Sequence, residues 1–215
     1  MNTKTALSLC CLVTLALSAY VASVYASLPQ VIPTHWDING KVNGYGPKST
    51  LFFFAAMPLM SILLMVGLPW LSPKNFSIDS FRRTFNYIMV IVTLLMAYIA
   101  VVSIYATRTP AWDLTKPLFS GIMLFIGLLG NLMGKVQRNF FVGIRTPWTL
   151  ASDKVWVATH RLGARLMTAA GIGGAILIWI GVPVMVAFIA FMVLTLYPVL
   201  YSLLLYKKLE KTQSV

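Results

Sequence analysis

The sequence contains few charged residues. Of 215 residues only 10% are charged, against about 25% in a typical soluble domain. Hydrophobic residues make up 59% of the chain, and the mean hydropathy is +0.82. This composition excludes an ordinary soluble domain and predicts an all-α, polytopic membrane protein.

Long stretches lack charge altogether, and they mark the expected membrane spans because an unpaired charge in the bilayer centre is costly. The last stretch has room for two helices of about 20 residues, with Gly181-Val182-Pro183 as the turn between them. We therefore expect six transmembrane helices. The uncharged stretches are residues 5–28, 49–73, 84–107, 117–134 and 166–206.

No Asp, Glu, Lys, Arg or His lies inside these spans. Ion-coupled carriers and pumps usually hold ionisable groups within the membrane, so this absence argues against a proton- or sodium-coupled carrier. Asn86 and Asn131 are the expected hydrogen-bonding groups between helices. Gly171, Gly173 and Gly174 predict a close approach of two helices.

Cysteine and histidine are also scarce. Cys10 and Cys11 are neighbours in the first span, which excludes a disulfide framework and a cysteine metal site. His35 with Asp37 is too small a set for a metal site, and His160 is expected on the opposite side of the membrane. We expect no metal and no cofactor.

Basic residues are distributed unequally between the two sides of the membrane. Thirteen of the seventeen Lys and Arg residues fall on the side that holds both termini. The positive-inside rule then places both termini in the cytoplasm of a cell membrane, with residues 28–48 outside. The net charge of +12 reflects this bias together with contact to membrane lipid. Because the basic residues are scattered along the membrane flanks, we expect no direct binding of nucleic acid.

The first span has two interpretations. It could be a secretory signal peptide, because Lys4 precedes an apolar core and small residues follow near Ala26. However, signal cores run to roughly 7–15 residues, and this core is longer. We therefore expect it to be retained as a membrane anchor.

The outer loop, residues 28–48, is expected to be structured. Asn-Gly pairs at 39–40 and 43–44 favour tight turns. Alternation of polar and apolar residues from Thr34 to Ile38 predicts a short strand that leads into a hairpin. This loop would cap the helices and offer a docking surface. Its candidate binding residues are His35, Trp36, Asp37, Asn39 and Gly40.

The inner segment, residues 135–165, is polar. Gly143 permits an unusual backbone angle, and the planar Arg145 guanidinium suits a carboxylate or a group of carbonyls. Ser152 and Asp153 predict the start of an inner amphipathic helix that runs to about Arg165. The candidate binding residues are Asn139, Gly143, Arg145, Pro147, Trp148, Trp156, His160 and Arg161.

Two interpretations of this inner segment remain open. In the first, the helix lies in the membrane interface with Trp156 among the headgroups. In the second, Arg145, Trp148, Trp156 and His160 form one ordered element that a partner recognises. An enzyme is not expected, because Asp153 and His160 lie about 10 Å apart along a helix, too far for a hydrogen-bonded acid–base pair.

The inner motifs resemble the signature of the SdpI family of bacterial membrane proteins. They are Asn131, Gly134, Asn139, Gly143-Ile144-Arg145, Pro147-Trp148-Thr149-Leu150, Val155-Trp156 and Thr159-His160-Arg161-Leu162-Gly163. Outer motifs resemble the domain of unknown function that precedes it in that family. They are Ile32-Pro33-Thr34-His35-Trp36, Asn39-Gly40 and Gly44-Tyr45-Gly46.

The resemblance implies two domains and a function. The expected units are an N-terminal two-helix unit, 1–73, and an SdpI-like four-helix unit, 74–215. The founding member of the family confers immunity to a secreted, membrane-active peptide toxin and also holds a transcriptional repressor at the membrane. The resemblance therefore implies immunity and signal transduction, with a peptide toxin and a cytoplasmic repressor as partners. The alternative is a transporter or exporter of a small amphipathic peptide.

Overall fold

The computed structural model describes residues 1–37 and 39–213, and within them the chain is mostly helical. Six of these helices are long and apolar enough to cross a membrane, which confirms the predicted fold class. They are α1 (Thr3–Tyr25), α2 (Thr50–Leu71), α3 (Arg82–Arg108), α4 (Thr115–Met133), α6 (Asp153–Trp179) and α7 (Val184–Gln213).

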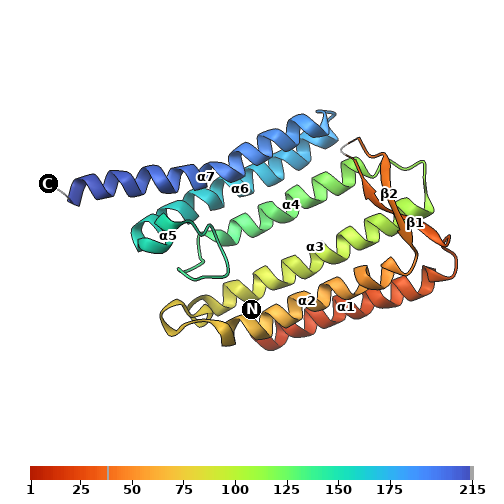
Figure 1. Cartoon of the computed structure of the whole chain (residues 1–215), viewed down its shortest axis with the longest axis horizontal. Helices are drawn as coiled ribbons and strands as arrows, with labels where there is room; N and C mark the ends of the chain where they lie inside the picture. The colour runs from red at the N-terminus through yellow and green to blue at the C-terminus, as the bar shows by residue number, and fades with distance from the viewer. Residues whose placement is uncertain (38, 214–215) are drawn as a thin grey trace.

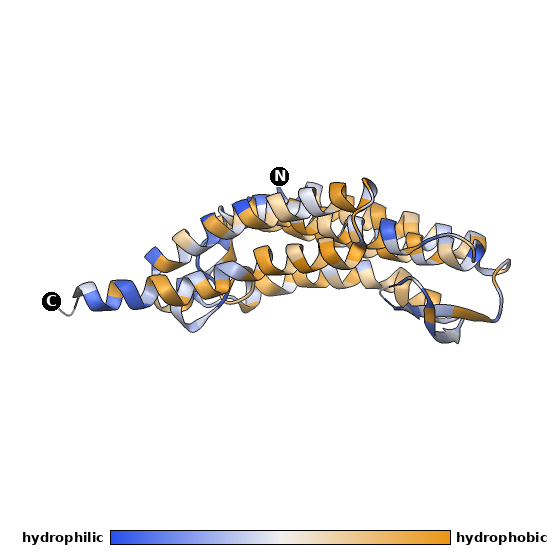
Figure 2. Ribbon diagram, turned by 90° about the horizontal axis from the view of Figure 1, so that it is seen from above, coloured by the Kyte–Doolittle hydropathy of each residue, from blue (hydrophilic) through white to orange (hydrophobic). Residues whose placement is uncertain are grey.

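The helices pack as two groups of three. α1, α2 and α3 pack against one another, α6 packs between α4 and α7, and the contact of α3 with α4 joins the groups (Figure 1). Both termini lie towards the end that carries the short helix α5 (Pro147–Ala151), and a β-hairpin lies at the opposite end. The middle of the bundle is strongly hydrophobic, and the end of α7 is hydrophilic (Figure 2). We call the α5 side the inner end and the hairpin side the outer end.

α6 begins where the sequence predicts but ends later. The side chain of Ser152 accepts a hydrogen bond from the backbone N–H of Val155 at 3.4 Å and caps the helix. The predicted end near Arg165 is wrong, because no proline interrupts the helical hydrogen bonds there and the helix continues to Trp179. The inner amphipathic helix is therefore the first part of a membrane helix, and His160, Arg161 and Arg165 belong to that same helix.

The predicted turn at residues 181–183 is confirmed. Gly181 has φ +100°, a conformation that L side chains rarely adopt. The N–H of Val182 donates to the carbonyl of Leu177 at 2.9 Å and closes the end of α6. Pro183 then precedes the first residue of α7.

Glycines bring α4 and α6 into close contact. A Cβ added to Gly171 would lie 2.6 Å from Cα of Gly127, and one added to Gly174 would lie 2.7 Å from the sulfur of Met123. A Cβ on Gly173 would meet nothing within 4 Å. The predicted close approach is thus within one chain, and it uses Gly171 and Gly174 but not Gly173.

The two asparagines expected between helices differ. Asn86 is fully buried, and its Nδ2 donates to the carbonyl of Met1 at 3.3 Å and to Oγ1 of Thr3 at 3.2 Å. These bonds join α3 to the start of α1 and confirm that prediction. Asn131 is exposed on α4, so its expected role between helices is wrong.

The outer loop forms an antiparallel hairpin of β1 (Val31–Trp36) and β2 (Val42–Pro47). Gly40 has φ +77° in the connection, as predicted. The second predicted turn is wrong, because Gly44 pairs with His35 within the ladder. Ile38, the last residue of the expected strand, lies outside the described residues.

Replacing Gly171 by Ala should destabilise the bundle, because the new methyl group would overlap the backbone of α4. Overpacking of this kind costs about 1–3 kcal/mol. The matched control is Gly173→Ala, which adds the same group to the same helix in open space. The thermal unfolding midpoints of the detergent-purified variants should fall for Gly171→Ala only. Equal midpoints would contradict this packing.

Candidate functional site

The loop between α4 and α6, residues 134–152, is held to α6 by His160. This side chain is 1% exposed. Its Nδ1–H donates to the carbonyl of Trp156 at 2.8 Å, and its Nε2 accepts the backbone N–H of Ile144 at 3.0 Å. Because Nε2 accepts a hydrogen bond here and must therefore carry no proton, the arrangement requires a neutral imidazole. We call residues 134–152 the inner loop.

Gly143 and Trp156 complete the packing around this ring. Gly143 has φ +117°, and a Cβ at this position would overlap Nε2 of His160. The indole of Trp156 stacks on the imidazole with 4.0 Å between ring centroids, and its Nε1 donates to the carbonyl of Val136 at 2.8 Å. Trp156 is 1% exposed, and its polar atom has its hydrogen-bond partner inside the protein. Of the two interpretations of the inner segment, the one that places Trp156 among the headgroups is therefore wrong.

Asn139 shapes the first half of the inner loop. Its buried Oδ1 accepts the N–H groups of Phe141 at 2.8 Å and Val142 at 2.7 Å. Its Nδ2 donates to the carbonyls of Gln137 at 2.8 Å and Val142 at 3.0 Å. The side chain thus satisfies four backbone groups of the loop.

The second half of the inner loop contains a capping box that the sequence analysis missed. Thr146 and Thr149 exchange side-chain and backbone hydrogen bonds at the start of α5, where Pro147 is the first helical residue. Thr149 Oγ1 also donates to the carbonyl of Ile144 at 2.8 Å. Thr146 Oγ1 lies 3.1 Å from Oγ of Ser202 and joins the loop to α7. The spacing Thr-Pro-x-Thr was the sequence signal from which this capping box could have been predicted.

Arg138 is a further residue that the sequence analysis missed. Its Nε lies 2.8 Å from Oδ1 of Asp153, and its Nη1 donates to the carbonyl of Leu150 at 2.8 Å. Its guanidinium also lies over the ring of Phe76, 5.2 Å from the centroid. Arg138 therefore ties the inner loop to the start of α6 and to the connection between α2 and α3.

The predicted inner residues fall into two groups. Asn139, Gly143, Trp156 and His160 face the protein and fix the loop. The exposed residues are Arg145, Pro147 and Arg161, while Trp148 is half-buried. The guanidinium of Arg145 donates a hydrogen bond to the carbonyl of Phe140, so the contact that positions it comes from the same loop.

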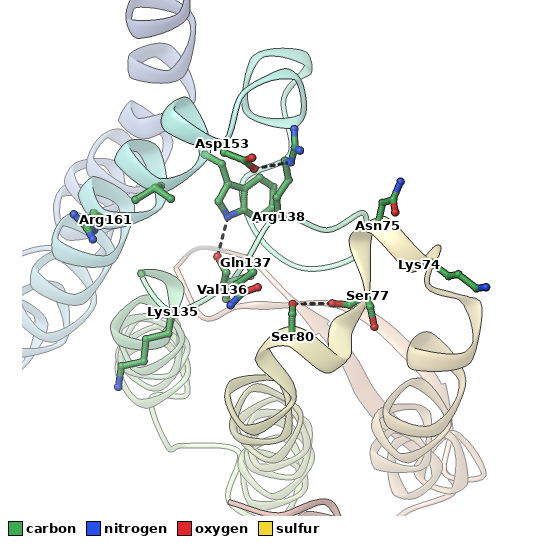
Figure 3. Close-up of a pocket in the computed structure, with 13 residues that line it drawn as sticks. Lys74, Asn75, Ser77, Ser80, Lys135, Val136, Gln137, Arg138, Asp153 and Arg161 are labelled. Carbon is green, nitrogen blue, oxygen red and sulfur yellow. Dashed lines mark hydrogen bonds and ion pairs between the residues drawn. The ribbon is translucent and has the colours of Figure 1, made fainter.

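A cavity of about 560 Å³ opens beside the inner loop (Figure 3). It lies between the connection from α2 to α3, the first residues of the inner loop and the first turns of α6. Its charged lining residues are Lys74, Lys135, Arg138, Asp153 and Arg161. The cavity is therefore strongly basic.

The outer candidate residues form the hairpin itself. Nδ1 of His35 is hydrogen-bonded to Oδ1 of Asn43 on the facing strand. Oδ1 of Asp37 accepts the N–H groups of Asn39 at 2.8 Å and Lys41 at 2.9 Å. Among residues 1–37 and 39–213, no three His, Cys, Asp or Glu side chains gather into a possible metal site. His35 and Asp37 thus shape the hairpin separately.

The end of the hairpin sits on the helices. Trp36 packs against Val102, Ala106 and Leu114. A Cβ on Gly40 would overlap Oγ1 of Thr115 at the start of α4. Asn39 is exposed and lines a small cavity with Asp113, Lys116 and the turn before α7. The outer loop is therefore a docked cap, as the sequence predicted.

Comparisons with known proteins agree with the resemblance seen in the sequence. Residues 135–202 match the SdpI/YfhL protein family, and residues 10–60 match a domain of unknown function, DUF1648. The chain is 27% identical over 148 residues to Immunity protein SdpI of Bacillus subtilis (strain 168), which covers 69% of each chain. No solved structure matches the chain significantly.

Replacing His160 by Ala should loosen the inner loop. The N–H of Ile144 would lose its acceptor, at a cost of about 1–3 kcal/mol for a buried donor. We expect faster tryptic cleavage after Lys135, Arg138 and Arg145 in the detergent-purified protein. The control is Arg161→Ala, which truncates the exposed neighbouring side chain. Identical digestion of the two variants would show that His160 does not hold the loop.

Proposed function

The chain is a multi-pass membrane protein in which residues 135–202 match the SdpI/YfhL protein family. From this premise we propose that it protects a bacterial cell against a secreted, membrane-active peptide toxin. The observation that carries the proposal is the similarity to Immunity protein SdpI along 69% of the chain. A match of 148 residues includes several helices and loops, so the similarity is not limited to one motif.

The geometry supports a protein that acts by binding. Both ends of the bundle carry ordered surfaces, because the hairpin is seated on α4 and the inner loop is fastened to α6. Between them the helices expose apolar side chains, with Leu63 in the middle of α2 66% exposed. A peptide that enters the bilayer would meet these side chains, and its capture there would prevent loss of the proton gradient.

The proposed orientation follows from the basic residues. With both termini in the cytoplasm, the hairpin residues His35, Trp36, Asp37, Asn39 and Gly40 face the arriving toxin. A fluorescent protein fused to the C-terminus should then fluoresce, whereas alkaline phosphatase at the same position should be inactive. The reverse result would overturn this orientation.

A second proposed role is to hold a cytoplasmic repressor at the membrane. The exposed inner side chains of Arg145, Pro147 and Arg161, with the half-buried Trp148, support it because a soluble protein could reach them. Co-purification of a candidate repressor from toxin-treated cells, lost with Arg145→Ala, would test this role independently of survival.

Survival of a toxin-sensitive bacterium that lacks its own immunity gene tests the main proposal. Cells expressing the wild type should survive a secreted, membrane-active peptide toxin, and Arg145→Ala should reduce survival at matched membrane abundance. Lys154→Ala is the control, since it removes another exposed inner cation and should leave protection intact.

If a well-expressed wild type failed to protect the cells, the proposal of immunity to that toxin would be wrong. Full protection by Arg145→Ala would keep immunity but remove Arg145 from the mechanism. Toxin flux into proteoliposomes that contain the protein would instead favour transport of an amphipathic peptide.

A further inference from the structure

The basic cavity beside the inner loop has a charge imbalance that the fold does not explain. Four cations line it, and Asp153 is the single acidic residue among its lining residues. That carboxylate is already paired with Arg138, whose Nε lies 2.8 Å from Oδ1 of Asp153. Within the described part of the chain, Lys74, Lys135 and Arg161 form no ion pair.

The lining comes from three separate segments. Lys74 and Asn75 lie on one side of the cavity in Figure 3, and Lys135 and Arg161 lie on the other. Ser80 sits between them, and its hydroxyl donates to the carbonyl of Ser77 at 2.8 Å, which leaves the oxygen free to accept. In Figure 3 the charged ends of Lys74, Lys135 and Arg161 point outward on opposite sides of the cavity. These long, flexible side chains can turn towards an anion that enters the space between them.

Arg138 gives the cavity a fixed wall. Its contacts to Asp153, to the carbonyl of Leu150 and to the ring of Phe76 hold the guanidinium in one orientation. The floor is equally fixed, because Trp156 is hydrogen-bonded to Val136. A site with rigid walls loses less conformational entropy when it binds a ligand.

We propose that this cavity binds the phosphate of an anionic phospholipid headgroup. Phosphate esters match the donors present, since Lys and Arg side chains form charge-assisted hydrogen bonds with phosphate oxygens. Basic pockets between membrane helices on the cytoplasmic side are a recurrent site for such headgroups. The inference does not depend on immunity, but it rests on the proposed orientation, in which the inner end faces the cytoplasm.

The surroundings favour a lipid over a free phosphate ester. Val157 lines the cavity and is 44% exposed, so an apolar surface adjoins the cations. The cavity also lies at the start of α6, whose later turns form a membrane span. A bound headgroup could therefore keep its acyl chains in the bilayer.

Native mass spectrometry of the full-length protein in detergent tests the proposal. Phosphatidylglycerol should form a saturable one-to-one adduct, and phosphatidylcholine should not. The variant Lys74→Gln/Lys135→Gln/Arg161→Gln should weaken phosphatidylglycerol binding at least tenfold. The control Lys4→Gln/Lys154→Gln/Lys208→Gln removes three exposed cations outside the cavity and should bind as the wild type does.

A second variant, Ser80→Phe, places a large side chain in the cavity without changing charge and should also abolish the adduct. Inorganic phosphate and glycerol phosphate are tested as ligands in separate experiments. Binding of phosphatidylglycerol alone supports the lipid, whereas equal binding of glycerol phosphate would replace it with a soluble phosphate ester. The proposed site would be overturned if the cavity and control variants weakened phosphatidylglycerol binding equally. It would also be overturned if Ser80→Phe bound phosphatidylglycerol as the wild type does.

Discussion

The pair of hydrogen bonds made by His160 is the constraint on which the inner end depends. One bond ties the imidazole to its own helix, and the other holds the backbone of Ile144, sixteen residues earlier. Gly143 must lack a side chain for the loop to approach the ring, and Trp156 must stack beneath it. The inner loop can therefore present Arg145 in a defined position only while His160 is neutral.

This dependence changes the meaning of the motif residues. A buried histidine beside a tryptophan resembles a ligand-binding pair in the sequence, yet here both side chains use their polar atoms within the protein. The motif residues that remain exposed, above all Arg145 and Arg161, are instead the ones that a partner could reach. The inner motif thus combines residues that build the loop with residues that stay exposed on the loop and on α6.

The sequence predicted the six helices because charges mark the ends of uncharged stretches, and the positive φ of Gly40 and Gly181 confirms two of the turns. It could not predict the end of the inner helix, since nothing local distinguishes a helix in the interface from the start of a span. The pairing of Gly44 with His35 and the role of Arg138 depend on contacts across the chain. The division into 1–73 and 74–215 stays a prediction.

The protonation of the His160 ring tests the central claim most directly. Nitrogen-15 NMR of the histidine-labelled protein in lipid bilayers separates the two ring nitrogens, and His35→Gln assigns the remaining signals to His160. A proton on Nδ1 and a bare, hydrogen-bonded Nε2 coupled to the amide of Ile144 is the predicted result. A proton on Nε2 at neutral pH would contradict it, because that nitrogen could not then accept the bond that fixes the loop.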